Sequence, residues 1–144
     1  MKKWIALALA LVMALSVSAC GSGSSGGKVA VFWYDFEDAY LSSVRQILDQ
    51  SLTKAGLSYQ DYDAKGSQTA QIEQIQSAIA EGVSALAVNI VEASSDEATQ
   101  TVVDMAKEAG LPLVFFNRSV AENIVSVYEK AAYVGTDYTM AGHM

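Results

Sequence analysis

The order of hydrophobic and polar positions predicts strands and helices that alternate from Lys28 onward. Val29–Trp33 is a continuous apolar run, typical of a strand buried on both faces of a parallel sheet. The predicted strands are Val29–Trp33, Leu57–Asp63, Ala85–Val88, Leu111–Phe116 and Ala131–Gly135, and the predicted helices are Tyr40–Gly56, Gln68–Ala80 and Ala93–Ala109. This alternation predicts an α/β fold in which helices flank a parallel sheet with right-handed crossovers.

The pattern weakens toward the end of the sequence. Ser119–Lys130 is expected to be a polar connection before the last predicted strand. Tyr138–Met144 has the pattern of a helix that stops after barely two turns, and no strand follows it. A helix this short is marginal alone, so the pattern predicts an incomplete domain.

The first 20 residues have the pattern of a targeting segment. A charged start precedes the apolar run Trp4–Leu15, and small residues then lead to Cys20, the one cysteine of the sequence. We expect residues 1–20 to be a lipoprotein signal peptide that ends at a lipidated Cys20, with 21–27 as a flexible Gly/Ser tether. The alternative is an ordinary secretory signal that leaves a free thiol.

The charge of the remaining chain argues against nucleic acid as a partner. Without Lys2 and Lys3, the Lys and Arg count falls from 9 to 7 against 16 Asp and Glu, which gives a net charge near −9. No basic patch of the kind that binds phosphates remains. The single proline and the 51% hydrophobic content argue against disorder.

The turn after the first predicted strand has the most distinctive chemistry. Residues 34–38 read Tyr-Asp-Phe-Glu-Asp, with the aromatic side chains of Trp33 and Tyr40 on either side. Ligands of open α/β sheets bind outside the carboxyl ends of strands, where this turn lies. No glycine-rich phosphate loop is present. Aromatic faces beside carboxylates suit a neutral sugar; the alternative is that the aromatic residues are core and the acidic ones solvated.

The chain resembles the periplasmic sugar-binding proteins of ABC transporters, and most of all the galactose/glucose-binding (methyl-galactoside) proteins. The resemblance covers essentially all of Lys28–Met144 and lies in four stretches: KVAVFWYDFEDAYLSSVRQILDQ, EGVSALAVNIVEASS, GLPLVFFNRS and YVGTDYTMAG. It implies a type I periplasmic-binding-protein-like fold, with a sugar held between two α/β lobes. Residues 28–117 would form a nearly complete amino-terminal sugar-binding lobe. Residues 118–144 would form the hinge crossover and the start of a truncated second lobe.

The resemblance also implies four ligand-binding residues. Asp38 matches a carboxylate that accepts sugar hydroxyls, and Asn89 matches an asparagine at a strand end. Tyr40 stands where the family has a stacking phenylalanine, and Tyr34 matches a tyrosine at the cleft edge. Asp38 and Asn89 should follow neighbouring strands and so converge on one ligand. The alternatives are that Asp38 caps its helix, that Asn89 forms a turn and that Tyr40 is core.

Two further residues at strand ends are expected to be structural. Trp33 belongs to an apolar strand and is more often core, although it is the second candidate for a stacking ring. Asn117 ends a strand at the hinge and is expected to be structural and not a ligand contact.

The function implied by the resemblance is capture of galactose or glucose outside the cytoplasm and delivery to an ABC permease by hinge closure. The chain would be anchored to the cell membrane by lipid, with a chemoreceptor as a further candidate partner. No catalytic residue, cofactor or metal is expected in this stretch, because a family calcium site would lie in the second lobe.

Other functions stay open. Ribose, inositol or a signalling molecule could be the ligand of the same fold. A hydrolase using Asp35 and Asp38 is the enzymatic alternative. A transcription-regulator sensor shares the fold but conflicts with the export signal. One lobe covers little more than one face of a sugar, so we expect weak binding, near ~1 mM.

Overall fold

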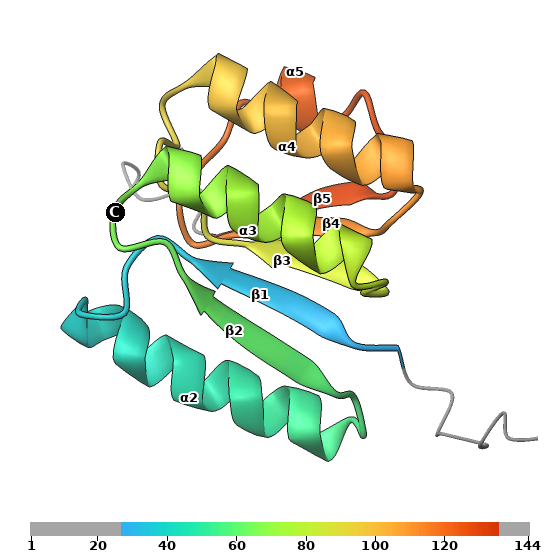
Figure 1. Ribbon diagram of the computed structural model, residues 1–144. Coiled ribbons are helices and arrows are strands. Elements are labelled where there is room, and N and C mark those ends of the chain that lie inside the picture. The colour runs from blue at the N-terminus through green and yellow to red at the C-terminus, as the bar shows by residue number, and fades with distance from the viewer. Residues whose placement is uncertain (1–26, 136–144) are drawn as a thin grey trace, which may run out of the picture.

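The computed structural model describes residues 27–135 and contains one five-stranded sheet, in the order β2-β1-β3-β4-β5 (Figure 1). Every neighbouring pair of strands is parallel. The strands are β1 (Val29–Trp33), β2 (Tyr59–Asp63), β3 (Ala85–Val88), β4 (Leu113–Phe116) and β5 (Ala131–Val134). The five predicted strands are confirmed, and each ends within one residue of its predicted end. The predicted signal peptide, Cys20 and the Tyr138–Met144 helix lie outside the described residues.

The helices cover the two faces of the sheet unequally. They are α2 (Ala39–Lys54), α3 (Gln68–Ala80), α4 (Asp96–Ala109) and the short α5 (Glu122–Val125). Figure 1 shows α2 on one face and α3, α4 and α5 on the other. The predicted α/β fold with a parallel sheet between helices is therefore confirmed. Within residues 27–135, no helix has the length and hydropathy needed to cross a membrane.

Polar side chains set where the three long helices begin. Asp38, Ser67 and Ser95 each accept a hydrogen bond from the backbone N–H three residues further on. Such N-caps satisfy donors that have no partner inside the helix. The third predicted helix was expected to start at Ala93, but α4 starts at Asp96 because Ser95 caps it.

β1 supplies side chains to both layers of the core. Ala30 and Phe32 belong to the cluster under α3 and α4, whereas Val31 and Trp33 pack with α2. All four side chains are fully buried. Trp33 is therefore core, as its strand position predicts, and its indole N–H donates to Asp61 Oδ1 at 2.7 Å.

The prediction of a polar connection over Ser119–Lys130 is wrong. The segment contains α5, and it buries the side chains of Ile124, Val125 and Tyr128. The Tyr128 hydroxyl donates to the Leu111 carbonyl oxygen at 2.9 Å. The apolar stretch Ile124–Tyr128 is interrupted by Ser126 and has polar residues on both sides, so it is too short to reveal a single helical turn.

Candidate functional site

The order of the strands gives the sheet a switch point between β1 and β3. These strands are neighbours, but the chain continues from β1 into α2 on one face and from β3 into α4 on the other (Figure 1). At such a switch point the two connections diverge and leave room for a ligand at the carboxyl ends of the strands. Asp38 follows β1 and Asn89 follows β3, so the prediction that they follow neighbouring strands is confirmed.

Both oxygens of Asp38 have partners in the chain. Oδ1 accepts the Leu41 backbone N–H at 3.0 Å and caps α2. Oδ2 accepts a short hydrogen bond from the Tyr34 hydroxyl. The capping alternative is therefore correct for one oxygen. Each carboxylate oxygen has two lone pairs, which leaves acceptor capacity at both.

The same contacts set the charge of Asp38. The hydrogen bond from Tyr34, and then the one from the Leu41 N–H, lower the pKa of the Asp38 carboxyl from its usual 3.8. The bond to Asp38, followed by burial, raises the pKa of the Tyr34 phenol. At neutral pH the pair is thus a carboxylate beside a neutral phenol, and the carboxylate is a strong acceptor for hydroxyl groups.

Asn89 is a buried amide without a partner. Its side chain has no exposed surface, and neither its oxygen nor its nitrogen has a hydrogen-bond partner in the structure of residues 27–135. Its backbone is held in place, because its N–H donates to the Phe32 carbonyl at 2.8 Å. The side chain makes no turn hydrogen bond of the kind that the turn-former alternative requires.

Gln71 shows how a buried side-chain amide is usually satisfied by hydrogen bonds. It is also fully buried, but its nitrogen donates to the Asn89 carbonyl at 3.0 Å and its oxygen accepts the Val91 N–H at 3.1 Å. Leaving a buried polar group unpaired costs about 1–3 kcal/mol. Asn89 is therefore a group whose hydrogen bonds a ligand can supply.

Arg118 joins this site, and the sequence reasoning missed it. Its Nη1 donates to the carbonyl oxygens of Ile90, at 3.2 Å, and Val91, and its guanidinium lies 4.5 Å from the centre of the Tyr34 ring. The sequence feature that could have identified Arg118 is its position just after Asn117, at the carboxyl end of β4, the strand beside β3. Asn117 itself adopts a left-handed backbone with φ 67, a conformation that asparagine tolerates, which agrees with its expected structural role.

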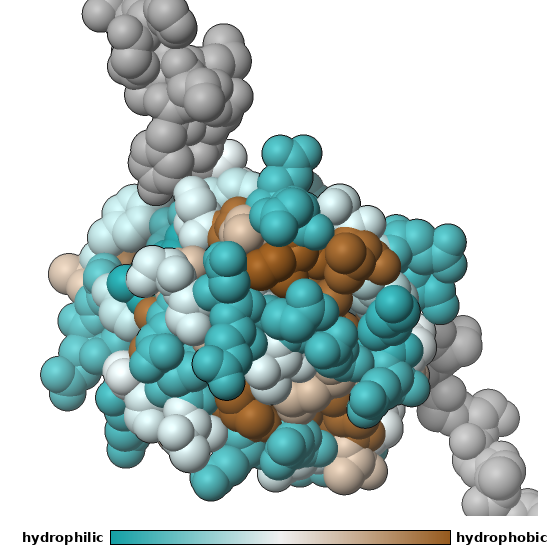
Figure 2. Space-filling view, turned by 90° about the horizontal axis from the view of Figure 1, so that it is seen from above, coloured by the Kyte–Doolittle hydropathy of each residue, from teal (hydrophilic) through white to brown (hydrophobic). Residues whose placement is uncertain are grey.

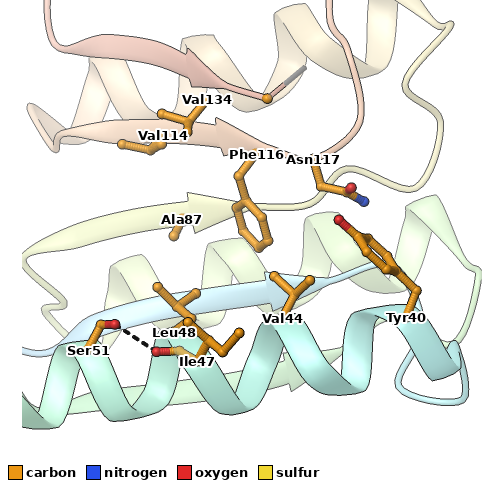
Figure 3. A pocket seen from close by; sticks show the side chains of 11 residues that line it. Tyr40, Val44, Ile47, Leu48, Ser51, Ala87, Val114, Phe116, Asn117 and Val134 are labelled. Atoms are coloured by element: carbon orange, nitrogen blue, oxygen red, sulfur yellow. Dashed lines mark hydrogen bonds between the residues drawn. The ribbon is translucent and has the colours of Figure 1, made fainter.

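Tyr40 lies in the first turn of α2 with its side chain on the surface. It is 67% exposed, so the alternative that it is core is wrong. Figure 3 shows its ring near Asn117, at one end of an apolar groove of about 540 Å³ between α2 and β3–β5. The structure thus brings Tyr34, Asp38 and Arg118 together and places Tyr40 at the mouth of this groove.

The acidic turn does not form a proton-sharing pair of carboxyl groups. Asp35 accepts the Glu37 backbone N–H at 2.8 Å, and Asp38 is bound by Tyr34 and its helix. A carboxyl group that acts as a general acid needs a raised pKa, whereas the pKa of Asp38 is lowered. Among residues 27–135, no cluster of three or more His, Cys, Asp or Glu is placed to hold a metal ion.

Comparison with known proteins gives this site a family context. Residues 29–144 match the model of the periplasmic binding protein domain. The chain is 32% identical over 143 residues to the D-galactose/methyl-galactoside binding periplasmic protein MglB of Haemophilus influenzae, covering 99% of this chain and 42% of the relative. It is 34% identical over 108 residues to a putative rhizopine-binding protein of Rhizobium meliloti, covering 74% and 34% respectively.

Solved structures share the fold. The Caulobacter myo-inositol binding protein bound to myo-inositol matches with a TM-score of 0.68 at 23% identity, over 83% of this chain and 38% of that one. GanP, a glucose-galactose binding protein from Geobacillus stearothermophilus, matches with a TM-score of 0.67 at 15% identity, over 83% and 40%. This chain spans less than half the length of these relatives. With its parallel sheet, its switch-point site and the family match over residues 29–144, the chain belongs to the periplasmic binding protein domain family.

Proposed function

We propose that this chain is the amino-terminal, sugar-binding part of a solute-binding lipoprotein that works outside the cytoplasm. Its ligand is galactose or glucose, which the whole protein delivers to an ABC permease. The observation that carries the proposal is the fully buried, unpaired Asn89 amide after β3, next to the strand whose turn holds the ionised Asp38. The relative named for D-galactose and methyl-galactoside supports this choice of sugar.

Each proposed site residue has a role that its chemistry allows. The Asp38 carboxylate accepts hydroxyl hydrogens, and the Asn89 amide both donates and accepts. Tyr34 fixes the carboxylate through its hydroxyl, and the exposed ring of Tyr40 offers an apolar face to the C–H side of a sugar. Asn89 has no exposed surface in the free chain, so ligand entry requires its neighbours to move aside.

A second candidate ligand is a cyclitol. A structural neighbour holds myo-inositol, and one relative carries the name of a putative rhizopine-binding protein. A cyclitol, like a hexopyranose, offers several hydroxyls around a six-membered ring to Asp38 and Asn89. It has a carbon in place of the ring oxygen and no hydroxymethyl group, and a direct titration separates the two candidates.

The cellular setting follows from the same proposal. Residues 1–20 act as a signal peptide, Cys20 carries the lipid, and residues 21–27 tether the domain to the cell membrane. The whole protein hands its ligand to permease subunits without chemical change, and a chemoreceptor is a further partner. Because this chain supplies one side of the cleft, we expect it to bind its sugar weakly, near ~1 mM.

The proposal is tested by titrating D-galactose, D-glucose, D-ribose and myo-inositol into the chain and following backbone amide shifts by NMR. We expect a hexose to shift amides near residues 34–41 and 89–91 with millimolar affinity. Asp38→Asn keeps a helix cap but loses the charge, so it should weaken binding at least about tenfold. Asp104→Asn, an exposed change on α4, is the matched control. Saturable shifts with myo-inositol alone would favour the cyclitol, and no shift with any of the four would overturn the proposal.

A further inference from the structure

Arg118 connects the carboxyl ends of three adjacent strands. It follows β4, its Nη1 donates to the Ile90 and Val91 carbonyls after β3, and its guanidinium lies over the Tyr34 ring after β1. These segments are more than 25 residues apart along the chain, with separations of 27 and 28 residues for the two carbonyl contacts. Among the hydrogen bonds and aromatic-ring contacts of residues 27–135, no other side chain links all three strand ends.

We propose that Arg118 is a positioning residue, which ties the turn after β1 to the loop after β3 and thereby fixes the spacing between Asp38 and Asn89. The affinity part of this inference rests on the proposed function, whereas the structural part can be tested without a ligand.

The contacts form a continuous chain from one site residue to the other. Asn89 is bonded directly to Ile90, whose carbonyl accepts from Arg118. Arg118 stacks on Tyr34, and the Tyr34 hydroxyl is bound to Asp38. A planar guanidinium can lie flat on a ring and donate to carbonyl oxygens in its own plane, a geometry that the ammonium group of a lysine does not offer.

The backbone before Arg118 aims its side chain at the site. Asn117 takes the left-handed conformation, its N–H donates to the Val134 carbonyl at 3.0 Å, and the Tyr133 hydroxyl donates to the Asn117 carbonyl at 3.4 Å. The Arg118 N–H then donates back to Phe116 O at 2.8 Å. The Arg118 contacts therefore start from a turn that is itself hydrogen-bonded to β5.

Arg45 provides a matched control. Its guanidinium also lies over an aromatic ring, 3.9 Å from the centre of Phe36, but it makes no hydrogen bond to the loop after β3. Arg45→Ala therefore removes the same charge and the same kind of contact as Arg118→Ala, without releasing the proposed tie.

The experiment compares the full chain with its Arg118→Ala, Arg118→Lys and Arg45→Ala variants by amide hydrogen exchange. The Asn89 N–H, bonded to Phe32, and the Val91 N–H, bonded to Gln71, report on the loop after β3, and the Leu113 N–H of β4 is the reference. We expect both Arg118 variants to speed exchange of the loop amides at least about tenfold relative to the reference, and Arg45→Ala to leave the ratio unchanged.

Two further readouts separate positioning from charge and from global stability. Arg118→Ala should raise the pKa of the Asp38 carboxyl, because Arg118 helps to lower it, and Arg118→Lys should restore that pKa without restoring loop protection. If Arg118→Lys restores both the Asp38 pKa and the protection of the loop amides, the positioning role is wrong. It is also wrong if hydrogen exchange of all amides, including the reference, becomes faster to the same extent. If loop exchange in Arg118→Ala equals that of the unchanged chain, it is also wrong.

Binding is measured separately with D-galactose. Both Arg118 variants should weaken binding about tenfold relative to Arg45→Ala. If the unchanged chain does not bind galactose but the loop loosens in both Arg118 variants, the proposed function fails while the positioning role is supported. If galactose binds the unchanged chain and the Arg118 variants equally, positioning by Arg118 is contradicted and the proposed function stands.

Discussion

Asn89 and Gln71 are both fully buried amides, yet only Gln71 has its hydrogen bonds satisfied within the described chain. A folded protein that leaves an amide unpaired gives up stability at that residue. Violations of the rules that stabilise a fold are expected mainly at functional sites. At the scale of single residues, this contrast supports the proposed binding role of Asn89.

Replacing the two amides should therefore change stability to different extents. We expect Gln71→Ala to lower the free energy of unfolding by about 2 kcal/mol, because it leaves the Val91 N–H without its partner. Asn89→Ala should change it by less than about 0.5 kcal/mol, because no hydrogen bond is lost and a desolvated amide is removed. Urea unfolding measures both, and equal destabilisation by the two variants would contradict the account.

The Tyr34–Asp38 pair makes a prediction that depends on pH. Tyr34→Phe removes the main contact that lowers the pKa of the Asp38 carboxyl, so that pKa should rise toward 3.8. A lowered folded-state pKa stabilises the fold above the unfolded-state pKa, and that stability is lost as pH falls through the folded value. The stability difference between the unchanged chain and Tyr34→Phe should thus be present at pH 7 and shrink at pH 2.

Carbon NMR of the Asp38 carboxyl group measures this shift directly, and Tyr59→Phe is a control for loss of a phenol elsewhere. An Asp38 carboxyl pKa that stays the same in Tyr34→Phe would show that the hydrogen bond from Tyr34 does not lower this pKa.

At the scale of elements, the sequence was informative where a segment is long or continuously apolar. The five strands and three long helices follow from apolar runs, helical spacing and capping residues. The boundary error at Ala93 and the missed α5 have different physical causes. The Ser95 cap sets the start of α4, which apolar spacing alone does not report. One turn of helix is stabilised mainly by tertiary burial, here of Ile124 and Val125, which a local pattern does not report.

The start of α4 gives a test of the capping argument. Ser95→Ala removes the side-chain oxygen that accepts the Ala98 N–H at 3.1 Å, and it should lower the free energy of unfolding by about 1 kcal/mol. Ser94→Ala changes an exposed serine one residue earlier and should have no measurable effect. Equal effects of the two substitutions in urea unfolding would show that Ser95 does not fix the start of α4.

At the scale of the whole molecule, the two faces of the sheet differ. Polar side chains cover much of the surface in Figure 2, on the side of α3–α5, with smaller apolar areas between them. On the other face α2 leaves an apolar groove beside β4 and β5, where Val114 is 36% and Val134 63% exposed. Figure 3 shows these apolar side chains along the groove.

This groove should bind an apolar dye. Val134→Thr keeps the β-branched shape but replaces one methyl group in the groove with a hydroxyl, so it should reduce the fluorescence of bound anilinonaphthalene sulfonate by about half. Val127→Thr is the control, because Val127 is similarly exposed, at 52%, but does not line the groove. If both variants reduce the dye fluorescence equally, the dye does not bind specifically in this groove.

The candidate site shows what sequence can and cannot provide at this scale. Asp38 and Asn89 could be placed together because parallel strands bring their carboxyl ends to one edge. The Arg118 contacts to Tyr34 and Val91 could not be predicted from the sequence. They depend on β4 lying beside β3 and on the left-handed backbone of Asn117. Such partners are fixed by strand order and by single backbone angles, which periodicity does not encode.

The side-chain amide of Asn89 provides the most direct test of the proposed site. Its two amide protons are followed by nitrogen-edited NMR while D-galactose is added to the chain, with Gln71 as the internal reference. The account predicts saturable shifts and slower solvent exchange of the Asn89 protons, because the ligand supplies their missing acceptors, while those of Gln71 stay unchanged. Galactose binding that shifts backbone amides elsewhere but leaves the Asn89 amide protons unchanged would contradict it.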